Sequence, residues 1–347
     1  MQKNRINVKI PLIRAKDEGN MRSATGGVAH VADIIREDLG ARDTGLHKPH
    51  ITGIADLASC ALATRCVNTA EWNVALPRKK CDAKSRERYI SRLLANKLIK
   101  SLSVMHGFIP EIIDMLAQNG QTIILSMDQS KISDGFECLM ISIRTAQRAM
   151  PVIWKVVETE GEIGFDIQNQ LLESALTLIP EGTNVCLAAD RFYGTSALIN
   201  WCKTQGWQYR IRLKGNLIFQ HEGGEITPQD AHQLRLDSLE NACFNKTDIS
   251  TNIGTLHEPN HPEPWFIAMD CKPSKYKVLD YGMRWGIECM FSDFKSRGFG
   301  ISQTHLKHAD RIERLILILT IAFFWAVSTG MNPKISQRHT KKNLPGR

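Results

Sequence analysis

The sequence predicts an α/β protein with a mixed β-sheet, helices on both faces of that sheet, a β-rich insertion and an α-helical N-terminal module. Residues 29–118 carry apolar side chains at helical spacing, for example Ile90 and Leu94. After the turn signal Asn119-Gly120, short β-prone runs alternate with helical ones. The 347 residues are enough for two or three domains.

The order of the expected elements narrows the fold class. Strands are expected at 122–127, 136–145, 152–157, 184–189 and 207–213, and helices at 167–178 and 195–204. This β-β-β-α-β-α-β order is that of the ribonuclease H fold, so we expect a ribonuclease-H-like core over 116–214 and 276–330. Residues 215–275 are rich in Gly, Pro, Asn and His and should form the β-rich insertion.

Positive charge is concentrated in the N-terminal third of the chain. The net charge is +8, and residues 1–100 hold 19 Lys and Arg against 10 Asp and Glu, while the rest holds 25 against 26. Such a surplus suits the neutralisation of phosphates, so residues 1–115 are expected to be a DNA-binding module, although a solvated surface helix is the alternative. The densest cluster comprises Arg78, Lys79, Lys80, Lys84, Arg86, Arg88, Arg92, Lys97 and Lys100. Residues 331–347 form a second basic cluster and are expected to be a flexible tail.

Cysteine usage and hydropathy exclude several protein classes. The nine cysteines include no C-x-x-C pair, and no basic-then-apolar leader opens the chain, which favours a reducing cytoplasm over secretion. The longest apolar run, 315–327, is too short to cross a bilayer and is expected to be a buried core helix. We therefore predict no membrane partner.

Two aspartates follow apolar strands of the expected core. Asp128 occurs in Leu-Ser-Met-Asp and Asp190 in Leu-Ala-Ala-Asp-Arg-Phe-Tyr-Gly. Carboxylates at strand ends are where α/β sheets place ligand and metal sites. Taken alone, each aspartate could equally be a helix cap or a turn residue.

A helix expected at 279–296 strengthens the prediction of a ligand or metal site at these aspartates. Tyr281, Arg284, Glu288 and Lys295 fall within an arc of about 60° on this helix and form one stripe. The apolar residues Met283, Ile287, Met290, Phe291 and Phe294 form a second arc beside it. The helix should therefore pack on the sheet and present the stripe at the margin of that contact, although an exposed Arg284–Glu288 ion pair is the simpler alternative.

This Tyr-Arg-Glu-Lys spacing resembles the signature of the insertion-sequence DDE transposases of the IS-four group, over roughly residues 121–327. The resemblance implies that Asp128, Asp190 and Glu288 form the catalytic and metal-binding triad. Carboxylate oxygens select Mg²⁺ or Mn²⁺, and two such ions suit phosphoryl transfer from DNA. The carboxylates Asp134, Glu137, Glu158 and Asp293 rank below the triad as candidates.

Further residues are candidates for DNA contact. From the stripe and the second aspartate motif these are Tyr281, Arg284, Lys295 and Arg191. Arg210, Arg212 and Lys214 alternate on one side of the last expected strand, where they contact DNA or guard a sheet edge from pairing. Trp265, in the insertion, is a candidate for stacking on an extruded base, with core packing as the alternative.

These features together predict a DNA transposase that binds the terminal inverted repeats of a mobile element, cuts the strands and joins the 3′ ends to target DNA. Double-stranded DNA and a second copy of the chain, in at least a dimer, are the expected partners, in a cytoplasmic, nucleoid-associated setting. A catalytically silent DNA-binding repressor or decayed copy is the main alternative. A ribonuclease-H-like nuclease without strand transfer is another.

Overall fold

The computed structural model describes residues 24–78, 80–145, 148–258 and 262–330. The chain divides into two compact units, one built from the segments up to Glu111 and from Ser292 onward, the other from Ile112–Phe291. The expected core included residues 292–330, whereas here they group with the N-terminal helices. The expectations for residues 1–23, for Lys79 and for the basic tail 331–347 concern residues outside the described part.

The first unit is helical, as the spacing of apolar residues predicts. Its N-terminal part holds α1 (Ala24–Ala41), α2 (Lys48–Thr64), α3 (Thr69–Ala75), α4 (Ala83–Leu94), α5 (Ser101–His106) and the start of α6 (Ile109–Leu116). Its C-terminal part holds the 3₁₀ turn η5 (Ile301–Gln303) and α12 (Ala309–Gly330). Side chains cap two of these helices, because Asn68 and Asp82 accept hydrogen bonds from the first turns of α3 and α4.

Helix α12 supplies the core of the first unit. It packs against α2, α4 and α5, and Leu315–Leu319 are buried. A helix that is apolar around most of its circumference must be covered on most sides, which explains why it joins the N-terminal helices. None of the described helices is long and apolar enough to cross a membrane.

The second unit contains a ten-stranded sheet in the order β3-β2-β1-β4-β5-β10-β9-β8-β6-β7. The strands are β1 (Ile123–Ser133), β2 (Phe136–Thr145), β3 (Arg148–Glu158), β4 (Val185–Ala189), β5 (Gln208–Arg212), β6 (Phe219–His221), β7 (Gly224–Ile226), β8 (Ser238–Phe244), β9 (Ser250–Leu256) and β10 (Trp265–Met269). The helical pieces are η2 (Gln118–Gly120), α7 (Phe165–Leu176), η3 (Arg191–Tyr193), α8 (Ser196–Thr204), α9 (Pro228–Gln233), α10 (Lys275–Leu279), η4 (Asp280–Trp285) and α11 (Gly286–Phe294), whose last residues belong to the first unit.

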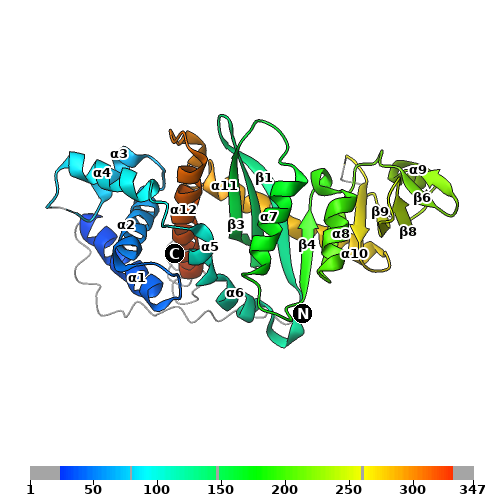
Figure 1. Cartoon of the computed structure of the whole chain (residues 1–347), viewed down its shortest axis with the longest axis horizontal. Coiled ribbons are helices and arrows are strands. Elements are labelled where there is room, and N and C mark those ends of the chain that lie inside the picture. The colour runs from blue at the N-terminus through cyan, green and yellow to red at the C-terminus, as the bar shows by residue number, and fades with distance from the viewer. Residues whose placement is uncertain (1–23, 79, 146–147, 259–261, 331–347) are drawn as a thin grey trace, which may run out of the picture. The chain divides into compact units, whose positions relative to one another are not determined.

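The sheet is mixed, which confirms the predicted α/β class. β1, β2 and β3 form an antiparallel meander, while β4 and β5 run parallel to β1. Figure 1 shows α7 and α8 in front of the strands and α11 behind them. The residues expected to form an insertion add five strands to the same sheet, because β10 pairs antiparallel with β5.

Candidate active site

The two aspartates lie beside each other where the parallel strands β1 and β4 stop pairing. The last paired residues are Met127 and Ala189, so Asp128 and Asp190 are the next residue on each strand. The expectation that Asp128 ends its strand is wrong, since β1 continues to Ser133 by pairing with β2. It is the end of the parallel pairing that places both carboxylates at one edge.

The segment that carries the stripe is divided into three pieces, and the prediction of one helix over 279–296 is wrong. Tyr281 and Arg284 lie in the 3₁₀ segment η4, Glu288 lies in the first turn of α11, and Lys295 follows the last residue of that helix. In a 3₁₀ helix residues i and i+3 eclipse, so Tyr281 and Arg284 still lie one above the other. η4 contacts β1, β4 and β5, which brings its side chains to the aspartates.

A single guanidinium group connects the acidic side chains. Arg284 donates from Nη1 to Oδ2 of Asp128 over 2.9 Å and from Nη2 to Oε1 of Glu288. Its Nε donates to the hydroxyl of Tyr281 over 3.1 Å, and this hydroxyl donates to Oδ1 of Asp190 over 3.2 Å. Asp128, Asp190 and Glu288 are therefore linked through one buried Arg-Tyr pair.

Burial and like charges shift the titration of this site. Burial raises the pKa of Asp128 to about 6, and the neighbouring Asp190 and Glu288 carboxylates add to the rise while Arg284 opposes it. Burial also works against the charge on Arg284, but Tyr281, Asp128 and Glu288 raise its pKa above the usual value. The site is thus an acidic cluster whose repulsion is only partly balanced by one cation.

The donor set suits a hard divalent cation, since it consists of carboxylate oxygens that repel one another. Among the described residues, no three acidic, histidine or cysteine side chains are arranged as metal ligands. The Arg284 guanidinium bonds to both Asp128 and Glu288.

A transposase DDE domain model matches residues 113–325, which is more than half of the 347 residues. The chain belongs to the transposase DDE domain family. This transposase domain spans the whole acidic site.

Comparison with solved structures gives only a distant likeness. One match is the X-ray crystal structure of Marinitoga piezophila Argonaute in complex with 5′ OH guide RNA and target DNA. It is 15% identical, covers 75% of this chain and 36% of that chain, and has a TM-score of 0.24. Curated protein sequences contain no match to this chain.

Tyr193 also lies beside the acidic site of the transposase domain, and the sequence predicts no role for it. It ends the 3₁₀ turn that follows Asp190, and it is 1% exposed. Among the described residues its hydroxyl has no hydrogen-bond partner. Burial, followed by Asp128 and Asp190, raises its pKa, so the phenol stays neutral beside the acidic cluster. Only its place three residues after Asp190 could have indicated this in the sequence.

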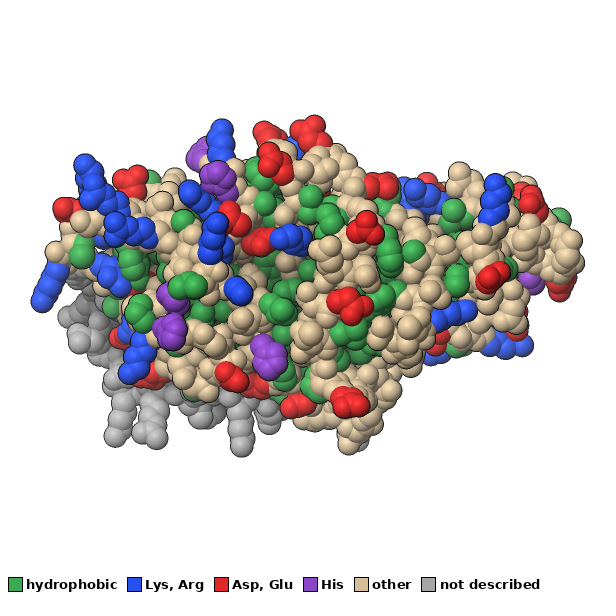
Figure 2. Space-filling model, viewed as in Figure 1, with side chains coloured by type: hydrophobic (Ala, Val, Ile, Leu, Met, Phe, Trp, Pro, Cys, Tyr) green, Lys and Arg blue, Asp and Glu red, His purple; other side chains and the backbone are tan. Residues whose placement is uncertain are grey.

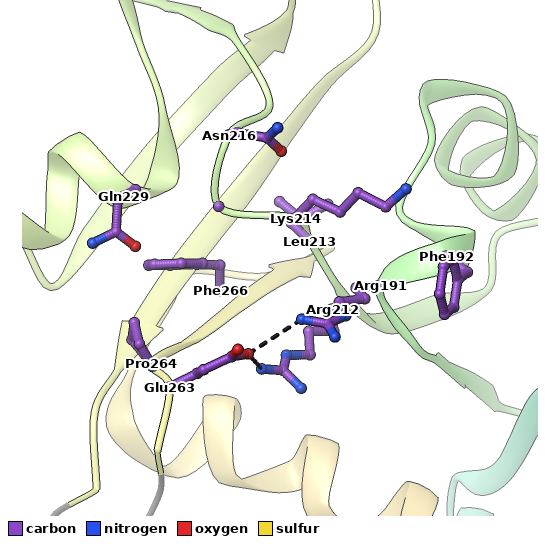
Figure 3. Close-up of a pocket in the computed structure, with 11 residues that line it drawn as sticks. Arg191, Phe192, Arg212, Leu213, Lys214, Asn216, Gln229, Glu263, Pro264 and Phe266 are labelled. Carbon is purple, nitrogen blue, oxygen red and sulfur yellow. Dashed lines mark hydrogen bonds and ion pairs between the residues drawn. The ribbon is translucent and has the colours of Figure 1, made fainter.

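The alternating cations, Arg210 and Arg212 in β5 and Lys214 just after it, have different surroundings. Arg210 is 2% exposed and donates to Oδ1 of Asp270 over 2.6 Å, so its charge is balanced inside the sheet. Arg212 and Lys214 instead line a cavity together with Arg191 (Figure 3). The alternative that these cations guard a sheet edge is wrong, because β5 lies between β4 and β10.

The remaining predicted site residues separate into two cases. Trp265 is half-buried and packs edge-on against Tyr281, with ring centroids 5.3 Å apart, so it supports the phenol that holds Asp190. Lys295 lies in the turn after α11, among residues of the first unit. Of the four residues of the predicted stripe, therefore, only Tyr281, Arg284 and Glu288 contact one another.

Asp128 predicts a pH dependence of stability. Its pKa is about 6 in the folded protein against an ordinary value of 3.8, so between these values the folded state binds more protons than the unfolded state. Its contribution to the free energy of unfolding is therefore complete below about pH 4 and is lost as the pH rises through about 6. With about 1.4 kcal/mol per pKa unit, the loss is about 3 kcal/mol.

Urea unfolding of the metal-free protein and of Asp128→Asn between pH 4 and pH 7 measures this loss. The stability of the wild type relative to the variant should fall by about 3 kcal/mol over this range. A difference that stays constant with pH would show that the Asp128 carboxyl titrates normally.

Proposed function

We propose that the chain is an insertion-sequence DDE transposase of the IS-four group with a ribonuclease-H-like core. It would bind the terminal inverted repeats of its element, cleave the strands and join the 3′ ends to target DNA. The observation that carries this proposal is the convergence of Asp128, Asp190 and Glu288 on Arg284 and Tyr281. Membership of the transposase family supports it.

The three carboxylates would hold two Mg²⁺ or Mn²⁺ ions. These ions would neutralise the scissile phosphate and activate the attacking water or 3′ hydroxyl. Burial is the main cause of the raised pKa of Asp128, and Asp190 and Glu288 add to it; this repulsion among the carboxylates favours a cation between them and supports the assignment. The proposed role of Asp128, Asp190 and Glu288 is to anchor these ions and to orient them. The ions would then activate the attacking water or 3′ hydroxyl.

Arg284 and Tyr281 would change partners when DNA and metal bind. In the present structure Arg284 balances the carboxylates, and it is only 7% exposed. A guanidinium released from carboxylates can hold a phosphate through two parallel hydrogen bonds. We therefore assign Arg284 and Tyr281 to the DNA strand next to the cleavage point, with Lys295 and Arg191 as further phosphate contacts and Trp265 as a candidate for base stacking.

Helix α4 is the proposed DNA-binding surface of the first unit. Lys84, Arg88 and Arg92 follow one another at intervals of four residues, and all three are exposed. Lys and Arg side chains gather over α3 and α4 in Figure 2. A row of exposed cations at one turn's spacing suits the neutralisation of consecutive phosphates.

Neutralising this row should weaken DNA binding and reduce its salt dependence. If all three cations contact phosphates, changing Lys84, Arg88 and Arg92 to Gln should lower the slope of log affinity against log salt by about 2 to 3. Gel shifts on the element ends at several salt concentrations measure this slope. A matched variant with Lys246, Lys272 and Lys275 changed to Gln loses the same charge elsewhere, and it should keep the wild-type salt slope. Equal salt slopes in the two variants would contradict the role of α4.

The proposed activity is tested directly with DNA that carries the flanking inverted repeats. The purified protein with Mg²⁺ should cut at the element ends, leave 3′ hydroxyls and join them to a target plasmid, as mapped by sequencing of the products. Binding without cleavage would indicate a silent repressor. Cleavage without joining would indicate a nuclease of the same fold.

The active complex is proposed to contain at least two copies of the chain, because two element ends must be brought together. A cytoplasmic, nucleoid-associated location is proposed with it. Light scattering of the protein with and without paired end DNA should show the change to a dimer or larger complex.

A further inference from the structure

The segment η4, which carries Tyr281 and Arg284, lies across one face of the sheet and contacts β1, β4 and β5. Its first end is fixed by apolar packing, because Tyr281 belongs to a buried cluster with Val278 of α10 and two residues of β10. The indole of Trp265 packs against this cluster, with its ring centroid 5.3 Å from that of Tyr281. The position of Tyr281 is therefore set from the β10 side of the sheet.

The second end of η4 is held by an arginine from the other side of β1, β4 and β5. Arg144, near the end of β2, donates from Nη1 to the backbone carbonyl of Met283 over 2.6 Å. Met283 directly precedes Arg284, so this bond acts on the backbone next to the guanidinium that bridges the carboxylates. A hydrogen bond from a charged donor is stronger than one between neutral groups, which suits it to fixing a short segment.

The register of β1 and β2 explains why Arg144 reaches this segment. Met140 lies directly opposite Asp128 in the antiparallel pair, so the side chains of these two residues project from the same face of the sheet. Arg144 follows Met140 by four residues, and the pairing of β2 with β1 is regular from Met140 to Ile143. Because side chains alternate along a strand, Arg144 projects from this face too. Arg144 and Asp128 thus approach η4 from one face of the sheet.

Close backbone packing adds to the bond at this end. Gly286, the first residue of α11, is buried, and a Cβ added to it would lie 3.3 Å from the carbonyl carbon of Arg148 and 3.4 Å from Cβ of Ala149. Ala149 is the residue of β3 that pairs with Arg144. The ends of β2 and β3 therefore hold the backbone on both sides of Arg284, by the hydrogen bond before it and by contact after it.

We propose that Arg144 is a positioning residue for Arg284. By fixing the carbonyl of Met283, it keeps the backbone of η4 in place while the Arg284 guanidinium changes from the carboxylates to a DNA phosphate. The proposal deepens the transposase function and rests on it, and Arg144 itself contacts no substrate. A misplacement of about 1 Å caused by a change far from the chemistry can cost about a hundredfold in rate, so a bond to the backbone next to Arg284 matters for cleavage.

The first test separates the cleavage rate from DNA affinity. Arg144→Gln in the full chain removes the charged donor, and it should lower the single-turnover rate of end cleavage with Mg²⁺ by about tenfold to a hundredfold. Affinity for the same DNA, measured by gel shift, should stay unchanged, because the exposed cations of α4 are kept. Arg144→Lys keeps a charged donor with a different reach, and its rate should fall between those of the wild type and Arg144→Gln.

The second test observes η4 directly, without metal or DNA. Trp285 follows Arg284 and is 62% exposed. In protein labelled with 5-fluorotryptophan, the fluorine resonance of this residue is assigned with Trp285→Phe. Arg144→Gln should shift or broaden the Trp285 resonance in EDTA, whereas the resonance of Trp201, in α8, should keep its position.

Lys203→Gln is the matched control. Lys203, in α8, donates to the backbone carbonyl of Ser250 over 2.5 Å, so this variant also loses a bond from a cation to a carbonyl in the second unit. It should keep the wild-type cleavage rate and the wild-type Trp285 resonance. Equal rate losses in Arg144→Gln and Lys203→Gln, or an unchanged Trp285 resonance in Arg144→Gln, would overturn the proposal.

Arg144→Lys decides the matter if Arg144→Gln does not fold. A folded Arg144→Lys protein with a reduced cleavage rate and a shifted Trp285 resonance supports the positioning role. Wild-type values of both in Arg144→Lys would make Arg144 a purely structural residue.

The two tests keep this role apart from the proposed transposase function. If the wild type fails to cut element ends, the transposase function is lost, and the Trp285 resonance still decides whether Arg144 sets the position of η4. If the wild type cuts the ends and Arg144→Gln cuts them equally fast, the transposase function stands and the role of Arg144 is lost.

Discussion

Asp190→Asn is expected to abolish strand cleavage while leaving binding to the element ends nearly unchanged. The amide keeps the size of the side chain and can still accept a hydrogen bond from Tyr281, but it supplies no negative charge to a cation. Loss of one member of a group that acts together typically costs a thousandfold or more in rate, and we expect a loss on the order of a thousandfold here. Cleavage of labelled end DNA and gel shifts on the same preparation measure the two properties separately.

Asp134→Asn is the matched control for this experiment. Asp134 lies in the turn between β1 and β2, where its side chain is fully exposed and pairs with Lys131. This variant should cleave and bind like the wild type. If Asp190→Asn lost binding and cleavage to the same extent, Asp190 would be a structural residue and not a catalytic one.

Removing the charge of Arg284 should destabilise the metal-free protein strongly and make it more dependent on divalent metal. Arg284→Met keeps an unbranched apolar stem but leaves Asp128, Asp190 and Glu288 without their cation, and breaking such a buried pair costs about 3 to 5 kcal/mol. Added Mn²⁺ would replace the lost charge. The melting temperature should therefore rise with Mn²⁺ far more in Arg284→Met than in the wild type.

The Arg210–Asp270 pair offers a control that also has a buried arginine and has no proposed metal chemistry. Arg210 is 2% exposed and bonds to Asp270 over 2.6 Å, so Arg210→Met should also lower the melting temperature. Mn²⁺ should not raise it beyond the wild-type response. If both variants responded equally to Mn²⁺, the effect would be unspecific binding and Arg284 would have no special relation to a metal site.

The strands of the core could be predicted from the sequence because their signals are local. The run 136–145 coincides with β2, and the run 184–189 contains β4. The length of β1 could not be predicted, because it depends on pairing with β2 beyond the point where β4 stops. The 3₁₀ segment η4 was missed for a similar reason, since the spacing of Tyr281, Arg284 and Glu288 fits an α-helix and a 3₁₀-α junction almost equally well.

Motif spacing grouped the candidate site residues, but it could not predict the contacts among them. Motif spacing indicated Asp128, Asp190 and Glu288 without indicating that Arg284 lies between two of them. The alternation of Arg210, Arg212 and Lys214 suggested three equivalent cations. Asp270, sixty residues after Arg210, makes the first of them a buried ion pair, and a partner that distant in sequence leaves no local pattern.

We propose that Asp128, Asp190 and Glu288 form one metal site and that Arg284 closes this site in the absence of metal. A crystal structure of the protein with Mn²⁺ and end DNA, with anomalous difference density measured at the manganese edge, tests this claim most directly. The claim predicts manganese peaks coordinated by all three carboxylates, with the Arg284 guanidinium displaced toward a DNA phosphate. Peaks elsewhere, with Arg284 still bridging Asp128 and Glu288, would contradict it.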